Sequence, residues 1–169
     1  MGISEILREG KKLGLINSHF YKRDLYERGI FNLFMKYDHS YIVIFGEDHE
    51  RMKRGGFYKN RKEIIKDLID IVLKETDHQN PVVILETSYP RELEDIKNVD
   101  VHRVLSGRGL REKVLKALRK YIPERKVVVL YIGRNHVRGV LEGIVYEILP
   151  DILFRDMLSS KNPPNGKNY

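Results

Sequence analysis

Two segments of the chain place a histidine three residues after a glycine, directly behind an apolar run. In "IFGEDHE" (residues 44–50) this histidine is His49, and in "YIGRNHV" (residues 131–137) it is His136. With 13 glycines and 6 histidines in 169 residues, chance would supply about half of one such spacing. Two of them, each after a strand-like run, therefore indicate a function.

Carboxylates stand at similar positions. Glu47 lies between the first glycine and its histidine, and Glu86 ends the apolar run "VVILE" (residues 82–86). An unpaired carboxylate on a buried strand would be destabilising by several kcal/mol. Glu86 therefore either has a chemical role or forms an ion pair with a basic residue such as Arg91.

Two imidazoles and neighbouring carboxylates suit a mononuclear metal site or a histidine–glutamate acid–base pair. Neutral imidazole and carboxylate together bind Zn²⁺, Mn²⁺, Fe²⁺ or Co²⁺. Such an ion would polarise a carbonyl and lower the pKa of its bound water to about 7. The expected metal ligands are His49, Glu86 and His136, and Glu47 or Glu86 is the expected general base.

Each histidine also has a structural interpretation. His49 could cap a helix or hydrogen-bond within a polar turn, and His136 could cap the helix expected near Val140. Of the other histidines, His78 lies in a polar turn, whereas His102 could reach the same crevice if residues 99–105 form a strand.

The elements that must position these residues are short apolar strands. Residues 41–46, 82–86 and 127–133 are nearly continuous runs rich in Val and Ile, and residues 99–105 are a weaker fourth candidate. Such runs are typical of strands buried on both faces of a parallel sheet. Glycine after two of these strands is expected to let the backbone turn sharply and approach a ligand.

Helical apolar stripes separate the strands, in residues 60–76, 110–121 and 140–149. Pro150 is expected to end or kink the third helix, after which "DILFRDML" resumes it. Alternating strands and helices predict an α/β fold with a mainly parallel sheet flanked by helices. Ligands of such sheets bind outside the carboxyl ends of the strands, where the site is expected.

The first forty residues are expected to be helical. "SEILREGKKLG" (residues 4–14) predicts a short helix ended by Gly14, and "YERGIFNLFMKY" (residues 26–37) predicts a second one. Residues 1–158 are interpreted as a single α/β domain. Residues 159–169, with two prolines and almost nothing apolar, are expected to be a disordered tail.

Composition narrows the class of protein. The absence of cysteine excludes disulfides, zinc–thiolate sites and thiol catalysis, and 33% charged residues resemble a thermophile's ion-pair-rich surface. No apolar run approaches the roughly 18–20 residues that span a membrane, so we expect a cytoplasmic protein without a membrane partner. The net charge of +7 gathers in residues 51–62 and 107–126. These segments are either solvated helix faces or a surface for weak, non-specific nucleic-acid binding.

The order of G-x-x-H, strand-end Glu and second G-x-x-H resembles the TraB/PrgY–Tiki group. Erythromycin-esterase-like and haem-binding ChaN-like proteins belong to the same superfamily. "GEDH" (residues 46–49) is similar to the G-E-x-H form of the esterase and ChaN branches. "IGRNHVRGVLEGI" (residues 132–144) resembles the second TraB motif, in which G-x-x-H-x-x-G opens a helix.

The resemblance implies an α/β sheet whose site contains His49, Glu86 and His136, with Glu47 as the acidic residue of the first motif. It implies a metal-dependent hydrolase of a peptide or small-molecule ester in the Tiki branch, a histidine-activated water in the esterase branch, and haem in the ChaN branch. Only 46 residues separate Glu86 from Gly133, where members usually carry a larger helical insertion. The alternatives are a haem- or ligand-binding module without turnover and a basic, nucleic-acid-associated protein.

Overall fold

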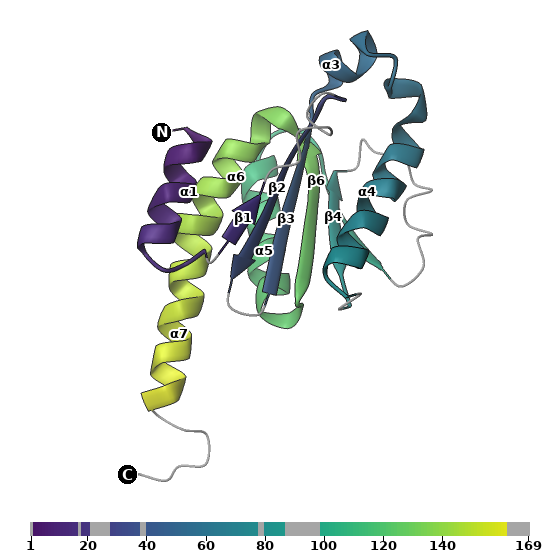
Figure 1. Ribbon diagram of the computed structural model, residues 1–169. Helices are drawn as coiled ribbons and strands as arrows, with labels where there is room; N and C mark the ends of the chain where they lie inside the picture. Colours follow the sequence, from purple (N-terminus) through teal and green to yellow (C-terminus); the bar gives the residue numbers. More distant parts are fainter. Residues whose placement is uncertain are drawn as a thin grey trace.

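The chain folds around one mixed sheet flanked by helices (Figure 1). The computed structural model describes residues 2–16, 18–20, 28–37, 40–77, 80–86 and 99–161. Within these residues the sheet has six strands in the order β1-β2-β3-β6-β4-β5. Their bounds are β1 Ser18–Phe20, β2 Ile30–Tyr37, β3 Ser40–Glu47, β4 Val82–Glu86, β5 Asp100–Val104 and β6 Val127–Gly133.

The parallel part of the sheet is the part that the sequence predicts. β3 pairs with β6, β6 with β4, and β4 with β5, all in parallel, while β1, β2 and β3 pair antiparallel. The expected central strands are confirmed, and the weaker candidate at residues 99–105 is the edge strand β5. The fold is therefore α/β with a mainly parallel sheet.

Helices cover both faces because the central strands are apolar on both. The helices are α1 Ile3–Lys12, α3 His49–Arg54, α4 Arg61–Glu75, α5 Leu110–Glu124, α6 Val137–Gly143 and α7 Leu149–Lys161. Alternate strand residues enter two separate cores. Val43 and Phe45 pack on the side of α4, whereas Ile42 and Ile44 pack on the side of α1, α5 and α6. This alternation fixes which face each strand-end side chain can reach.

The last helical region continues through Pro150 and does not end there. After α6 the chain makes a five-residue π-helical turn, η4 (Ile144–Ile148), and Pro150 is then the second residue of α7. Proline lacks the N–H that an α-helix would use, and it is tolerated in the first turn of a helix. The expected kink is thus a local change of helical pitch immediately before the proline.

The N-terminal part corrects the sequence prediction. α1 ends as expected before Gly14, whose φ is +70°. Residues 30–37, however, form strand β2 and not a helix, paired with β3 from Ile30↔Glu47 to Tyr37↔Ser40. The run is buried on both faces, with Phe34 against the α4 side and Leu33 against the other.

At the other end, α7 extends to Lys161, so residues 159–161 are helical where a disordered tail was predicted. Residues 162–169 lie outside the described part of the chain. Figure 1 shows α7 projecting beyond the sheet. Within the described residues, the helices are too short or too polar to cross a lipid bilayer.

Candidate functional site

The residues singled out by the sequence lie at the carboxyl ends of three neighbouring strands, β3, β6 and β4, along one edge of the sheet. β6 lies between β3 and β4, with Glu47 of β3 opposite Gly133 of β6. Leu85 of β4 is opposite Tyr131, which places Glu86 beside the last residues of β6. The predicted edge is therefore the one where these side chains lie.

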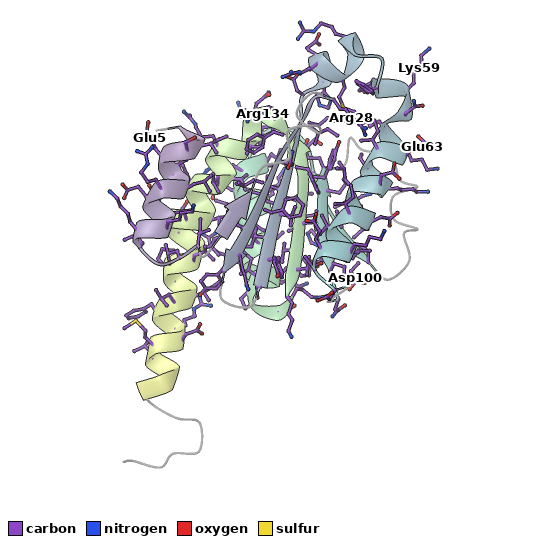
Figure 2. All side chains as sticks on the ribbon, in the orientation of Figure 1. Glu5, Arg28, Lys59, Glu63, Asp100 and Arg134 are labelled. Atoms are coloured by element: carbon purple, nitrogen blue, oxygen red, sulfur yellow. The ribbon has the colours of Figure 1, made fainter. Side chains whose placement is uncertain are left out.

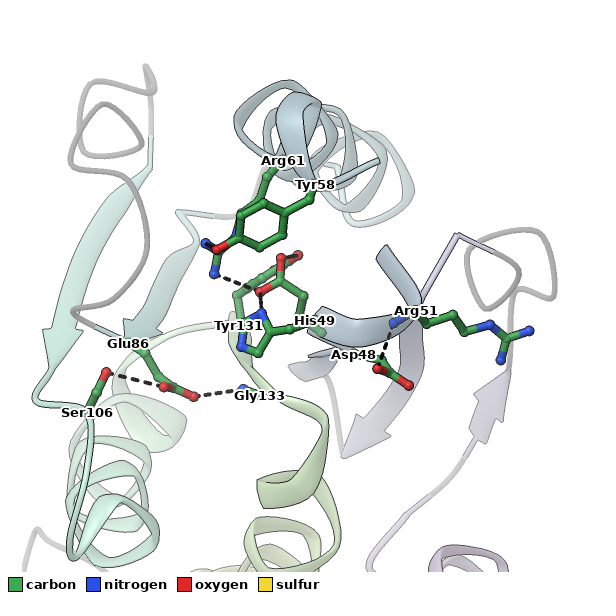
Figure 3. Close-up of polar contacts among 10 residues, drawn as sticks. Asp48, His49, Arg51, Tyr58, Arg61, Glu86, Ser106, Tyr131 and Gly133 are labelled. Carbon is green, nitrogen blue, oxygen red and sulfur yellow. Dashed lines mark hydrogen bonds and ion pairs between the residues drawn. The ribbon is translucent and has the colours of Figure 1, made fainter. Parts of the chain in front are cut away.

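Glu47 is the centre of a buried polar group, whose other members His49, Arg61 and Tyr131 are labelled in Figure 3. The residue is 1% exposed. Its Oε2 accepts a hydrogen bond from Nη2 of Arg61 at 2.7 Å and lies 3.0 Å from Nδ1 of His49. The Tyr131 hydroxyl is 3.5 Å from the other carboxylate oxygen. One buried carboxylate thus holds a guanidinium and an imidazole together.

Local structure fixes the position of His49. Asp48 is the N-cap of α3, and its Oδ1 accepts a hydrogen bond from the backbone N–H of Arg51 at 3.1 Å. His49 is therefore the first residue of α3 and not its cap, so the capping interpretation does not apply. Its side chain is 46% exposed, which leaves the imidazole accessible to solvent.

Arg61 is brought to Glu47 by the start of α4. The short helix η1 (Tyr58–Asn60) precedes α4, and Tyr58 stacks 5.1 Å from the Arg61 guanidinium while accepting a hydrogen bond from its Nη1 at 3.3 Å. The His49 ring also meets Tyr58 edge to face, with 6.4 Å between ring centroids. Tyr58 therefore contacts both partners of the buried carboxylate.

Glu86 is the centre of a second polar group. It is 7% exposed, and its Oε1 accepts the backbone N–H of Gly133 at 2.7 Å. Ser106, in the segment after β5, donates to its Oε2 at 3.3 Å. The predicted alternative partner, Arg91, lies outside the described residues.

His136 lies next to this second group. A methyl group at Gly133 would lie 3.5 Å from Cδ2 of His136 and 3.6 Å from Oε1 of Glu86, so both side chains flank that glycine. His136 is the last residue of η3 (Arg134–His136) and occupies the N-cap position of α6, but its side chain makes no capping hydrogen bond. The structural role expected for a capping histidine is therefore absent.

The two groups point to opposite faces of the sheet. Glu47 follows Val43 and Phe45 in the alternation that faces α4, whereas Glu86 follows Val82 and Ile84 toward α5 and α6. Their bonds agree, since Glu47 bonds to Arg61 of α4 and Glu86 bonds to the start of the turn that enters α6. The structure brings Glu47 to His49 and Glu86 to the vicinity of His136.

The described histidine, aspartate and glutamate side chains were the candidates to hold the expected metal ion. Among the described residues there is no cluster of three histidine, aspartate or glutamate side chains that could hold a metal ion. Oxygens of both glutamates already accept hydrogen bonds from Arg61, Gly133 and Ser106. An ion shared by His49, Glu86 and His136 stays a prediction, as does haem.

The first glycine of the two motifs acts by its size, and neither glycine acts by an unusual backbone conformation. Neither Gly46 nor Gly133 has a positive φ. A methyl group at Gly46 would lie 2.5 Å from Cγ2 of Val137 and 3.4 Å from Cα of Arg134. Gly46 therefore allows the turn after β6 to pack directly on β3, whereas a sharp reversal of the backbone was expected.

Comparison of the chain with protein-family models, with curated proteins and with solved structures finds no match. The case for a function therefore rests on the geometry of these residues. The TraB/PrgY–Tiki resemblance stays a prediction.

Sequence reasoning missed Arg61, Tyr131 and Ser106. Tyr131 carries the one signal that was available, because its hydroxyl interrupts an otherwise aliphatic strand two residues before the glycine. Arg61 lies fourteen residues after Glu47, and no local pattern joins the two. The remaining candidate, His102, lies on β5 with Nδ1 3.1 Å from the Tyr121 hydroxyl, and it takes no part in either polar group.

Proposed function

We propose that the chain is a hydrolase of ester or peptide bonds in which His49 is the general base and Glu47 its orienting carboxylate. The observation that supports this most strongly is the buried Glu47, which bonds to Arg61 and contacts His49 through the same oxygen. A carboxylate paired with arginine accepts hydrogen bonds and donates none. The proton of the imidazole then lies on Nδ1, and Nε2 carries the lone pair that can accept a proton.

The reaction follows from that tautomer. Nε2 of His49 accepts a proton from a water molecule while the water oxygen attacks the carbonyl carbon of the substrate. The tetrahedral intermediate collapses as the bond to the leaving oxygen or nitrogen breaks, and the proton passes from His49 to that atom. The products are a carboxylic acid and an alcohol or amine. General-base assistance of this kind contributes about 10²–10⁴-fold in rate.

In this proposal, His136 and Glu86 form a second acid–base pair at the carboxyl ends of the strands. A metal-dependent version of the same hydrolase, with His49, Glu86 and His136 as ligands, is the alternative that the TraB/PrgY–Tiki resemblance favours. A ligand-binding module without turnover is the alternative from another class. The fixed tautomer of His49 favours hydrolysis, because binding alone does not require an oriented base.

The test is a hydrolysis assay on 4-nitrophenyl esters and on short peptides carrying a chromogenic amide, with and without a chelator. The proposal predicts activity that survives the chelator and a loss of about 10²-fold or more in kcat/KM for His49→Ala. His102→Ala is the matched control, because that histidine lies on β5 outside both polar groups.

The outcomes separate the alternatives. Activity that disappears with the chelator and returns with one added divalent ion would replace the metal-free version with the metal-dependent one. Equal activity in wild type and His49→Ala would refute the assignment of the base. No cleavage of any substrate, together with tight haem uptake, would favour the binding module.

A further inference from the structure

A small polar cavity lies at the carboxyl ends of β3 and β6, close to Arg134, which is labelled in Figure 2. Its volume is about 170 Å³, and its lining residues are Gly29, Phe31, Asp48, Arg51 and Arg134. Asp48 directly precedes His49, and Arg134 directly follows Gly133. The cavity therefore adjoins both motifs of the candidate site.

Arg134 is oriented by stacking. The centre of its guanidinium lies 4.4 Å from the centroid of the Phe31 ring. A guanidinium stacked on an aromatic face keeps its N–H edge available, and that edge matches the two oxygens of a carboxylate or phosphate. The face of Arg134 is thus held by the protein while its donors remain available for a ligand.

Arg134 differs from the arginines that form ion pairs with carboxylates. Arg61, Arg111 and Arg125 each contact a carboxylate at 2.7 Å. Among the described residues, no carboxylate forms an ion pair with Arg134, whose guanidinium stacks on the Phe31 ring. A half-buried cation at a cavity wall is therefore available to an anion from solution.

The other charges of the cavity agree with an anionic ligand. Among the described lining residues Asp48 is the acidic one, and its Oδ1 accepts a hydrogen bond from the backbone N–H of Arg51 as the cap of α3. Among the described lining residues, two guanidinium groups stand against one carboxylate, which favours an anion over a cation. Such a wall attracts anions into a partly desolvated space.

We propose that this cavity binds an anionic group, a carboxylate or a phosphate, with Arg134 as its principal ligand and Arg51 as a second cation. The assignment of that group to the substrate rests on the proposed hydrolase. It predicts esters or peptides that carry an acidic group close to the bond that is cleaved. Binding of the anion itself does not depend on catalysis.

The binding test titrates the wild-type protein with inorganic phosphate and, separately, with acetate, followed by the NMR signals of the Gly29 amide and the Arg134 side chain. We expect saturable shifts with at least one anion and a Kd at least tenfold weaker in Arg134→Ala. The anion that gives saturable shifts shows whether the cavity binds a carboxylate or a phosphate. Arg125→Ala is the control, because Arg125 pairs with Asp100 at the start of β5.

Two further variants keep the binding test decisive. Arg134→Lys retains the charge but lacks the planar fork, so its affinity should lie between those of wild type and Arg134→Ala, and it carries the test if the alanine variant fails to fold. Arg51→Ala should weaken binding by less than Arg134→Ala. Absence of saturation with both anions, or wild-type affinity in the Arg134 variants, would overturn the proposal.

Turnover then separates this inference from the proposed function. On a 4-nitrophenyl ester that carries a free carboxylate, Arg134→Ala should raise KM at least tenfold, whereas on a neutral ester of equal length KM should be unchanged. Anion binding without cleavage of either ester would refute the hydrolase and leave the cavity assignment standing. Equal cleavage of both esters without anion binding would refute the cavity assignment and leave the hydrolase standing.

Discussion

At the scale of single residues, the ion pair of Arg61 with Glu47 is the interaction on which the site depends. The two side chains are 11% and 0% exposed, so removing the arginine leaves a buried carboxylate whose other partners among the described residues are an imidazole and a phenol. Breaking a buried pair in this way costs about 3–5 kcal/mol. We therefore predict that Arg61→Ala lowers the free energy of unfolding by about 3 kcal/mol in urea denaturation.

The control for that measurement is Arg119→Ala. Arg119 and Glu147 are 46% and 43% exposed and lie 3.8 Å apart, so solvent screens their attraction. Exposed pairs of this kind contribute about 0–1 kcal/mol. Similar losses of stability in the two variants would contradict the view that Glu47 depends on Arg61.

His102 gives a prediction about pH. Burial, and then repulsion by Lys120, lower the pKa of His102 below its ordinary value of 6.5. Between the lowered pKa and 6.5 the unfolded state binds more protons at this residue than the folded state does. The contribution of His102 to stability is therefore fully present above pH 6.5 and is lost as the pH falls through the lowered pKa.

NMR titration of the His102 ring should give a midpoint below 6.5. Urea denaturation at several pH values should show that His102→Gln flattens the fall in stability on the acidic side, relative to the wild type. A midpoint at or above the ordinary value, or equal pH dependence of both proteins, would contradict this assignment.

At the scale of elements, Gly46 controls how closely the turn after β6 approaches β3. An alanine there would place its methyl group 2.5 Å from Cγ2 of Val137, and valine is too stiff to move aside. We predict that Gly46→Ala destabilises the fold by about 1–3 kcal/mol, the usual range for overpacking. Thermal or urea unfolding would measure this loss.

The double variant Gly46→Ala/Val137→Ala tests the mechanism. Val137→Ala removes the atom that clashes, so the two losses should sum to more than the loss in the double variant. Gly133→Ala is the control, because a methyl group there would make ordinary contacts of 3.5 Å and 3.6 Å. Additive losses would show that the contact between Gly46 and Val137 is not the cause.

The elements also show why one sequence prediction failed. The parallel strands were predictable because each is a short β-branched run between helical stripes. In "IFNLFM" (residues 30–35) the apolar side chains fit a helical stripe as well as a strand buried on both faces, and local pattern alone cannot separate the two. Residues 30–37 form a strand because they pair with β3 along their whole length.

The candidate site was predictable in part for a similar reason. Strand ends of a parallel sheet share one edge, which placed Glu47, His49, Glu86 and His136 in the same region. The face to which each glutamate points depends on which helices cover that face, and this is a property of the tertiary structure. The separation of Glu47 from Glu86, and the contact with Arg61, could therefore not be read from spacing.

At the scale of the whole molecule, the chain has a net charge of +7, and ion pairs offset part of the positive charge of its basic segments. Arg111, Arg119 and Arg125 of the basic segment 107–126 each contact a carboxylate. These three ion pairs reduce the positive charge that the segment can offer to phosphates, so we predict weak and salt-sensitive binding of nucleic acid. Affinity for duplex DNA should fall as salt rises to about 200 mM, whereas nanomolar binding at that concentration would contradict the prediction.

The claim that joins these scales is that Glu47 and His49 act as one catalytic unit at the edge of the sheet. The measurement that tests it most directly is a double-mutant cycle in kcat/KM on a reactive ester, with Glu47→Gln, His49→Ala and the double variant compared where all are folded. Residues that act as a unit are not additive, so the double variant should lose no more than His49→Ala alone, about 10²-fold or more. Losses that multiply, or a His49→Ala variant with the kcat/KM of the wild type, would contradict the account.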